Sequence, residues 1–203
     1  MKNKRALIVV DVQNDFCPKG NLSVTDGDQV IEPINKLMDY GNYDLIVATQ
    51  DWHPQDHKSF ASNNSGKKIG EMSTLNGLPQ VMWPDHCIQH SLGAAFHKEL
   101  YSSKFQYVVK KGKNKEVDSY SGFFDNDKVS ATEMEHILKA HNISEVDVVG
   151  LALDYCVKAT AEDSQRLGFK TAVILDATRA VNLSPDDGDK ALADMKKQGI
   201  KIK

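Results

Sequence analysis

Short runs of consecutive apolar residues are the feature that most constrains the fold of this chain. They are rich in valine and isoleucine, and they recur from one end of the chain to the other. A strand that is apolar at every position needs cover on both faces, which is typical of a parallel sheet between two layers of helices. The runs predict strands at ALIVV (6–10), DLIVAT (44–49), FQYVVKK (105–111), VDVVGLA (146–152), TAVILDA (171–177) and the terminal IKI (200–202).

Helical patterns separate these runs. Apolar residues at helical spacing predict helices at 28–40, 91–100, 130–141, near 155–167 and at 186–198. Ser130 with Glu133 three residues later is a capping-box signature for the third of them. The predicted fold is therefore α/β, a three-layer sandwich with a mostly parallel six-stranded sheet and helices on both faces.

The chain shows no repeat and no linker, so we expect one domain over residues 1–203. Two polar stretches, 54–80 and 112–127, are longer than ordinary connections, and loops of this length are often functional. We interpret them as insertions into that domain.

Composition narrows the class of protein. A net charge of −3 gives no electrostatic reason to expect nucleic acid or anionic lipid as a partner. The apolar run near the N-terminus ends after five residues at Asp11, too short for a signal peptide, and no run of 18 apolar residues predicts a membrane span. Cys17, Cys87 and Cys156 are widely and irregularly spaced, which favours a reducing compartment and a cytoplasmic protein.

Charged or reactive residues follow four predicted strands. Asp11 ends the first, Asp51 and His53 follow the second, Lys110 and Lys111 end the third, and a turn after the fourth leads to Cys156. In an open parallel sheet, ligands bind beyond the carboxyl ends of the strands. These side chains are therefore expected to meet at one edge of the sheet.

Cys156 is the candidate nucleophile, although a lone cysteine is more often a small buried packing residue. Asp154 can cap a following helix, which would place Cys156 in its first turn, where free amides stabilise a thiolate and can receive an oxyanion. Asp11 could remove the thiol proton and return it to a leaving nitrogen, unless it is only a turn residue. One lysine, Lys110 or Lys111, could keep Asp11 ionised and help to stabilise the Cys156 thiolate.

The segment DWHPQDHKSF (51–60) is the candidate metal site. Asp51 and His53 project to the same side of an extended chain, and His86 could add an imidazole from the next loop. His57 is a further candidate ligand. A carboxylate and imidazoles suit zinc, iron or manganese. Four aromatic residues near these groups could bind a flat ring or pack in the core: Phe16, Trp83, Tyr120 and Tyr155.

Five blocks together resemble one family. They are DVQNDF (11–16), TQDWHP (49–54), WPDHC (83–87), KGKNKEVDSYSGFFDN (111–126) and GLALDYCVKAT (150–160). Their order and spacing are similar to those of the nicotinamidase/pyrazinamidase family of isochorismatase-like cysteine hydrolases. The resemblance covers nearly the whole chain and implies hydrolysis of nicotinamide to nicotinate and ammonia in NAD salvage, with pyrazinamide as a second substrate.

The resemblance also implies roles for individual residues. The triad would be Asp11, Lys111 and Cys156, with Lys111 selected because it precedes glycine. Asp51, His53 and His86 would bind one divalent metal ion, most simply Zn²⁺, with Fe²⁺ or Mn²⁺ as alternatives. A cis peptide is expected between Leu151 and Ala152, and the amides of Ala152 and Cys156 would form the oxyanion hole. Phe16, Trp83 and Tyr120 would enclose the ring.

Alternatives remain open at this point. The chain could be a related amidohydrolase acting on a carbamoyl or ureido compound, or a metallohydrolase in which metal-bound water is the nucleophile and Cys156 only packs. A binding domain with a degenerate site is a third interpretation. Leu153 departs from the smaller or polar residue common in the family. The sequence predicts a small-molecule substrate and no nucleic-acid or membrane partner, and it leaves a homo-oligomer open.

Overall fold

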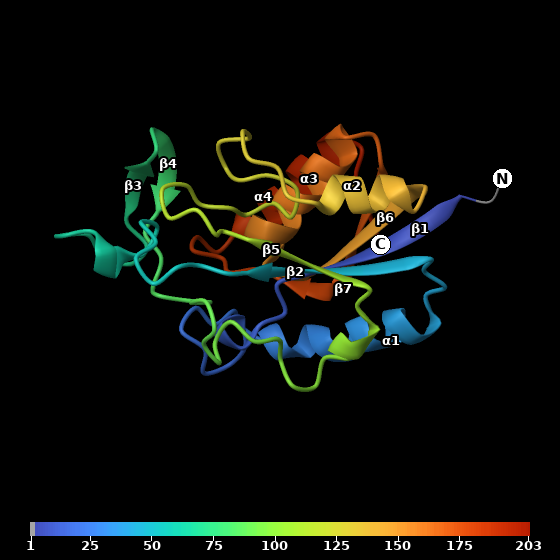
Figure 1. The fold of residues 1–203 in the computed structure, drawn as a ribbon, viewed down its shortest axis with the longest axis horizontal. Coiled ribbons are helices and arrows are strands. Elements are labelled where there is room, and N and C mark those ends of the chain that lie inside the picture. Colours follow the sequence, from blue (N-terminus) through green and yellow to red (C-terminus); the bar gives the residue numbers. More distant parts are fainter. Residues whose placement is uncertain (1–2) are drawn as a thin grey trace.

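The computed structural model describes residues 3–203, and its centre is a six-stranded sheet in the order β5-β2-β1-β6-β7-β8 (Figure 1). All of its strand pairs are parallel. This confirms the predicted α/β class. The strands are β1 (Lys4–Val10), β2 (Leu45–Asp51), β5 (Tyr107–Lys111), β6 (Ile143–Leu151), β7 (Lys170–Arg179) and β8 (Lys201–Ile202).

Helices cover both faces of the sheet. Helix α1 (Ile31–Tyr40) lies on one face, and α2 (Met134–Ala140), α3 (Lys158–Arg166) and α4 (Asp187–Lys197) lie on the other (Figure 1). Alternate side chains of β1 enter two separate cores, because successive residues of a strand point to opposite faces. Burial of these apolar side chains is the main stabilising contribution to the three layers.

A small antiparallel hairpin, β3 (Met72–Leu75) and β4 (Leu78–Val81), stands apart from the main sheet (Figure 1). It lies within the long polar stretch 54–80 and its continuation. In Figure 1 it lies beyond the end of the sheet to which the arrowhead of β2 points. The insertion therefore extends the molecule at the carboxyl edge of the strands.

The helix predicted at 91–100 is wrong. This segment forms successive turns, and its carbonyl groups bind elsewhere in the molecule. The amides of Asn14 and Asp15 donate to the carbonyls of Ala95 (2.9 Å) and Gly93 (3.0 Å). A helix would consume these carbonyl groups internally, so the pairing with residues 14–15 replaces it.

Two predicted helix starts are also wrong. Helix α2 begins at Met134, not at 130, and no capping box forms, because the carbonyl of Ser130 accepts the amide of Asp125 (3.0 Å) in a loop. Asp154 does not cap its own helix. Its carboxylate instead accepts the backbone amides of Val181 and Asn182, each at 2.9 Å, and so binds the loop that follows β7.

The other predicted helices are present with shifted bounds. A 3-10 turn (Gly27–Val30) precedes α1, and a π-helical turn (Leu153–Val157) precedes α3. None of the helices over residues 3–203 is long and apolar enough to cross a membrane.

Gly150 lets β1 and β6 approach closely near their carboxyl ends. Its φ is +111°, a conformation that L side chains rarely adopt, and a Cβ there would lie 2.1 Å from the carbonyl oxygen of Val10. This contact brings the chain that follows β6 next to Asp11, the residue that follows β1. The peptide bond between Leu151 and Ala152 is cis, as expected.

Candidate active site

Lys111 is the centre of the group of charged residues at the carboxyl edge of the sheet. Its side chain is buried, and its Nζ lies 2.9 Å from Asp11 Oδ2 and 3.5 Å from Cys156 Sγ. It also donates to Asp51 Oδ1 and to the carbonyl of Ser119 (2.9 Å). Burial alone would lower the pKa of Lys111, but Asp11 and Asp51 raise it well above the usual value. The lysine is therefore charged and links the candidate triad to the candidate metal site.

Asp11 is held in a defined orientation immediately after β1. It adopts a left-handed backbone conformation (φ +48°), and Thr49 Oγ1 donates to its Oδ1 at 2.7 Å. The other oxygen, Oδ2, faces Lys111. Burial raises the pKa of Asp11 to about 6, against the lowering effect of the Lys111 charge. A carboxyl group with this pKa can both accept and release a proton near neutral pH.

Cys156 lies in the π-helical turn before α3, and its sulfur lines the same site. One oxygen of Asp11, one of Asp51 and the sulfur of Cys156 all lie within 4.8 Å of one another. Burial raises the pKa of the Cys156 thiol well above its usual value, although Lys111 lowers it. Burial thus favours the neutral thiol and Lys111 favours the thiolate. A nucleophilic Cys156 needs a base, and Asp11 is within reach.

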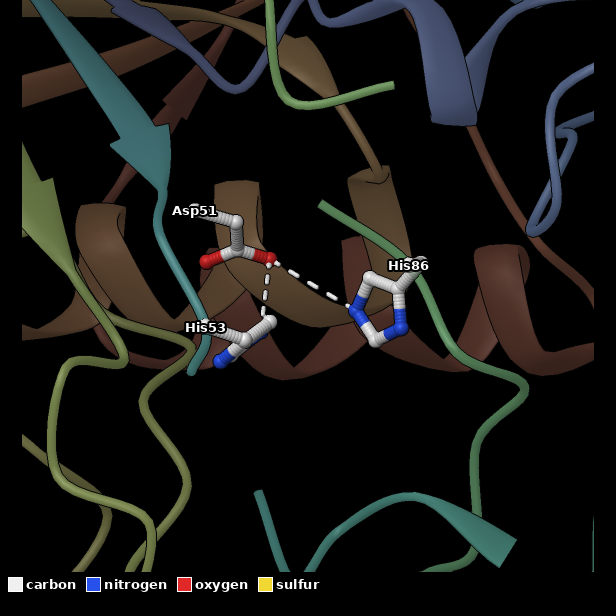
Figure 2. A group of neighbouring side chains, drawn as sticks. All are labelled: Asp51, His53 and His86. Carbon is white, nitrogen blue, oxygen red and sulfur yellow. Dashed lines mark ion pairs between the residues drawn. The ribbon is translucent and has the colours of Figure 1, made fainter. Parts of the chain in front are cut away.

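The side chains of Asp51, His53 and His86 converge (Figure 2). Lys111 pairs with the first of them. Asp51 Oδ2 lies 3.5 Å from His53 Nε2 and 3.8 Å from His86 Nε2. Each ring binds a carbonyl through Nδ1, that of Gly112 at 2.9 Å for His53 and that of Pro84 at 2.7 Å for His86. Such bonds fix the tautomer and leave Nε2 free to bind a metal.

The donor atoms of these residues suit a divalent cation. Burial would lower the pKa of His53, but Asp51 raises it above its usual value, so a metal ion would displace a proton there. Burial alone would raise the pKa of Asp51, but Lys111, His53 and His86 lower it below its usual value. Burial and the neighbouring His53 lower the pKa of His86 to about 4, so its imidazole is neutral. One carboxylate and two imidazoles form a ligand set typical of Zn²⁺, Fe²⁺ or Mn²⁺, with positions left open for water or substrate. These residues can hold a divalent metal ion.

His57 belongs to a neighbouring group. It forms a second cluster of ligand-type atoms with His53 and Asp118, also within 4.8 Å of one another. Its Nδ1 bonds Ser59 Oγ at 2.8 Å, and its buried Nε2 has no hydrogen-bond partner among residues 3–203. Its imidazole is therefore next to the Asp51 cluster without being part of it.

A narrow pocket opens onto these groups. Its walls include the four predicted aromatic residues: Phe16, Trp83, Tyr120 and Tyr155. The rings of Trp83 and Tyr155 meet edge to face with centroids 5.0 Å apart, and Trp83 Nε1 donates to the hydroxyl of Tyr120 at 3.1 Å. Asp51, His86, Ala152 and Cys156 also line it. Aromatic walls of this kind favour a flat ring as the ligand.

Sequence reasoning missed several residues of the site. Leu22, Asp118 and Val181 line the pocket, and Thr49 orients Asp11. Asp118 lies in the long loop 112–127. The length of this loop indicated a functional role but no particular residue. Leu22 and Val181 come from loops whose residue types give no such signal.

Comparison with known proteins places this geometry in a family. A model of the isochorismatase domain matches residues 5–202. The chain belongs to the isochorismatase family. This member is 45% identical to the nicotinamidase of Escherichia coli over 98% of its own length and 93% of that protein.

Solved structures agree with this placement. A nicotinamidase and pyrazinamidase of Acinetobacter baumanii superposes with a TM-score of 0.94 at 42% identity, over 100% of this chain and 96% of that one. The pyrazinamidase of Pyrococcus horikoshii, solved in complex with zinc, superposes with a TM-score of 0.79 at 35% identity, over 98% of each chain. Within the isochorismatase family, the chain therefore lies among the nicotinamidases and pyrazinamidases.

Proposed function

We propose that this protein is a nicotinamidase, an amidohydrolase that converts nicotinamide to nicotinate and ammonia through a thioester on Cys156. The observation that carries the proposal is the convergence of Asp11, Lys111 and Cys156 at one end of an aromatic pocket. Full-length similarity to nicotinamidases supports the substrate. Pyrazinamide, which has the same carboxamide on a similar flat ring, is proposed as a second substrate.

The metal site favours a pyridine over an aliphatic amide. Asp51, His53 and His86 would hold one divalent ion, and Zn²⁺ is proposed because a relative of 35% identity was solved with zinc. When bound, the ion would act as a Lewis acid toward the ring nitrogen. Phe16, Trp83, Tyr120 and Tyr155 would hold the ring itself, with the carboxamide directed at Cys156.

In the first half of the reaction, Asp11 takes the proton from Cys156 Sγ and the sulfur attacks the carboxamide carbon. The amides of Ala152 and Cys156 are proposed to stabilise the tetrahedral oxyanion. The C–N bond then breaks, and the leaving nitrogen takes the proton from Asp11 and departs as ammonia. Lys111 keeps Asp11 ionised at the start of this sequence.

In the second half, Asp11 takes a proton from water, whose oxygen attacks the thioester carbon. The C–S bond breaks, the sulfur recovers the proton from Asp11, and the product leaves as nicotinic acid, which gives its proton to solvent and becomes nicotinate. Asp11 thus returns to its starting state after each half. A pKa of about 6 suits this double role, because both protonation states are accessible near neutral pH.

The test is release of ammonia from nicotinamide by the purified protein, with and without a chelator. We expect turnover of nicotinamide and pyrazinamide, loss of it after chelation, and recovery with Zn²⁺. Cys156→Ala should abolish turnover, and mass spectrometry should detect an acyl adduct on Cys156 of the wild type. Turnover by Cys156→Ala at near wild-type rate would point to a metal-bound water as nucleophile, and turnover of N-carbamoyl compounds alone would point to a different amidohydrolase.

A further inference from the structure

Two buried polar side chains beside Asp11 take no part in the proposed reaction. Gln13 is fully buried and Asp15 is 8% exposed, and neither is among the residues that line the pocket. We infer that Gln13 and Asp15 are positioning residues that hold the three metal ligands in place. This inference rests on the proposed function, because it concerns the ion that the proposed enzyme would carry.

Gln13 binds both sides of the backbone of Asp51. Its Oε1 accepts the Asp51 amide at 2.8 Å, and its Nε2 donates to the Asp51 carbonyl at 2.8 Å and to the Ala94 carbonyl at 2.9 Å. The paired register of β1 and β2 ends at Val9 and Ala48, before Asp51 is reached. Asp51 pairs with Lys111 of β5 on one side, and the Gln13 amide takes the place of β1 on the other. It thereby fixes the direction in which the Asp51 carboxylate leaves the chain.

Asp15 holds the second ligand-bearing loop. Its Oδ2 accepts the amide of Cys87, the residue after His86, at 2.7 Å, and its Oδ1 accepts the amide of Asn21 at 3.2 Å. The carbonyl of Cys87 in turn accepts the amide of His53 at 3.0 Å. One peptide segment thus joins His53 and His86, and Asp15 fixes it through a charge-assisted hydrogen bond.

Local packing restricts the Asp15 carboxylate on the side of Gly93. A Cβ on Gly93 would lie 2.1 Å from Asp15 Oδ2, so the glycine backbone lies directly against the carboxylate. Cys87 has a left-handed backbone (φ +45°), a conformation that is unfavourable for cysteine and has to be held by a hydrogen bond. The short segment that begins at Asp11 therefore sets the general base and, through Gln13 and Asp15, the geometry of all three metal ligands.

The experiment measures the dissociation constant for Zn²⁺ of metal-stripped protein, by competition with a chromogenic chelator. The variants are Gln13→Met, which removes the three hydrogen bonds of the side-chain amide, and Asp15→Asn, which removes the negative charge and leaves one acceptor oxygen for the two backbone amides of Asn21 and Cys87. Both variants nearly keep the volume of the side chain. Asn35→Leu is the matched control, because the Asn35 amide binds the backbone of Glu99 (2.8 Å) and Tyr101 (3.0 Å) in the same way on the α1 side. We expect about 10–100-fold weaker binding in the two variants and wild-type binding in the control.

The outcomes separate this inference from the proposed function. Wild-type Zn²⁺ affinity in Gln13→Met and Asp15→Asn would overturn the positioning role and leave the nicotinamidase intact. A wild type that binds Zn²⁺ but releases no ammonia from nicotinamide would refute the function, and the affinities would still decide the positioning role. A wild type that binds no Zn²⁺ overturns the inference. So does failure of both variants to fold by circular dichroism while Asn35→Leu folds, because their role is then in the fold alone.

Discussion

Lys111 illustrates how a single residue can connect two kinds of chemistry. A buried ammonium is unfavourable unless it is paired, and here it is paired with two buried carboxylates at once, Asp11 and Asp51. One carboxylate belongs to the proposed triad and the other to the proposed metal site. Removal of this charge should therefore affect both.

Lys111→Met is expected to lower the free energy of unfolding by about 3–5 kcal/mol, because it leaves two carboxylates buried without their partner. Chemical denaturation of the wild type and the variant measures the difference. Lys110→Met is the control, since Lys110 contacts the ring of Trp52 on the other side of the same strand. Equal stability of the Lys111 variant and the wild type would contradict the pairing.

Asp11 should determine how the rate depends on pH. Because burial raises its pKa to about 6, and the reaction begins with its ionised form, kcat/KM should fall about tenfold for each pH unit below 6. Thr49→Val removes a hydrogen bond that favours the carboxylate, so the acid limb should move to higher pH. Thr49→Ser should restore the wild-type profile. A rate that stays constant down to pH 5 would exclude Asp11 as the base.

At the scale of elements, the close contact of β1 and β6 brings Asp11 to the chain that carries Cys156. Gly150 makes this contact possible, since any side chain there meets the Val10 carbonyl. The two strands could otherwise not keep both their register and this separation. The position is thus a geometric requirement of the fold, with consequences for the site.

Gly150→Ala should lower the free energy of unfolding by about 3 kcal/mol or more, because the new side chain strains the backbone and collides with Val10. Gly168→Ala is the matched control, because Gly168 also has a positive φ (+92°) but open space around its Cβ position. Gly168→Ala should lower the free energy of unfolding by about 1–2 kcal/mol, from backbone strain alone. Thermal or urea unfolding of both variants tests this, and equal losses would show that the Val10 contact is unimportant.

At the scale of the whole molecule, Asp147 in β6 joins parts that are distant in the sequence. Its carboxylate accepts hydrogen bonds from Arg5 (2.6 Å), Tyr43 (2.8 Å) and Lys203 (2.6 Å). Burial opposes ionisation, but these three partners lower the pKa of Asp147 below its usual value. The Asp147 carboxylate thus connects β1, the segment before β2 and Lys203.

A lowered pKa in the folded state stabilises the protein above the unfolded value of about 4, and this stability is lost as the pH falls through the folded pKa. Asp147→Asn should therefore lower the free energy of unfolding by about 1–3 kcal/mol at pH 7. The difference in this free energy between variant and wild type should become smaller in acid. Urea unfolding at pH 7 and pH 3 measures both values. Glu145→Gln, which loses a more exposed ion pair with Lys170, should cost less than about 1 kcal/mol.

The sequence by itself predicted the sheet, its strands and the residues that meet at its carboxyl edge. Apolar runs report burial on both faces, and the strand direction then places Asp11, Asp51, Lys111 and the turn of Cys156 at one edge. The family resemblance added the choice of Lys111 and the expected cis peptide. The catalytic and metal-binding roles of these residues stay predictions for the experiments above.

Only the tertiary structure decided how these residues are held. Asp154 looked like a helix cap but binds the amides of Val181 and Asn182, and 91–100 looked helical but gives its carbonyl groups to residues 13–15 and 50. The same holds for Gln13, Asp15 and Thr49, whose hydrogen bonds to Asp51, Cys87 and Asp11 each join residues 38 or more positions apart in the chain. Periodicity is a local property of the chain, whereas a hydrogen bond between a side chain and a remote backbone depends on which loops the fold brings together.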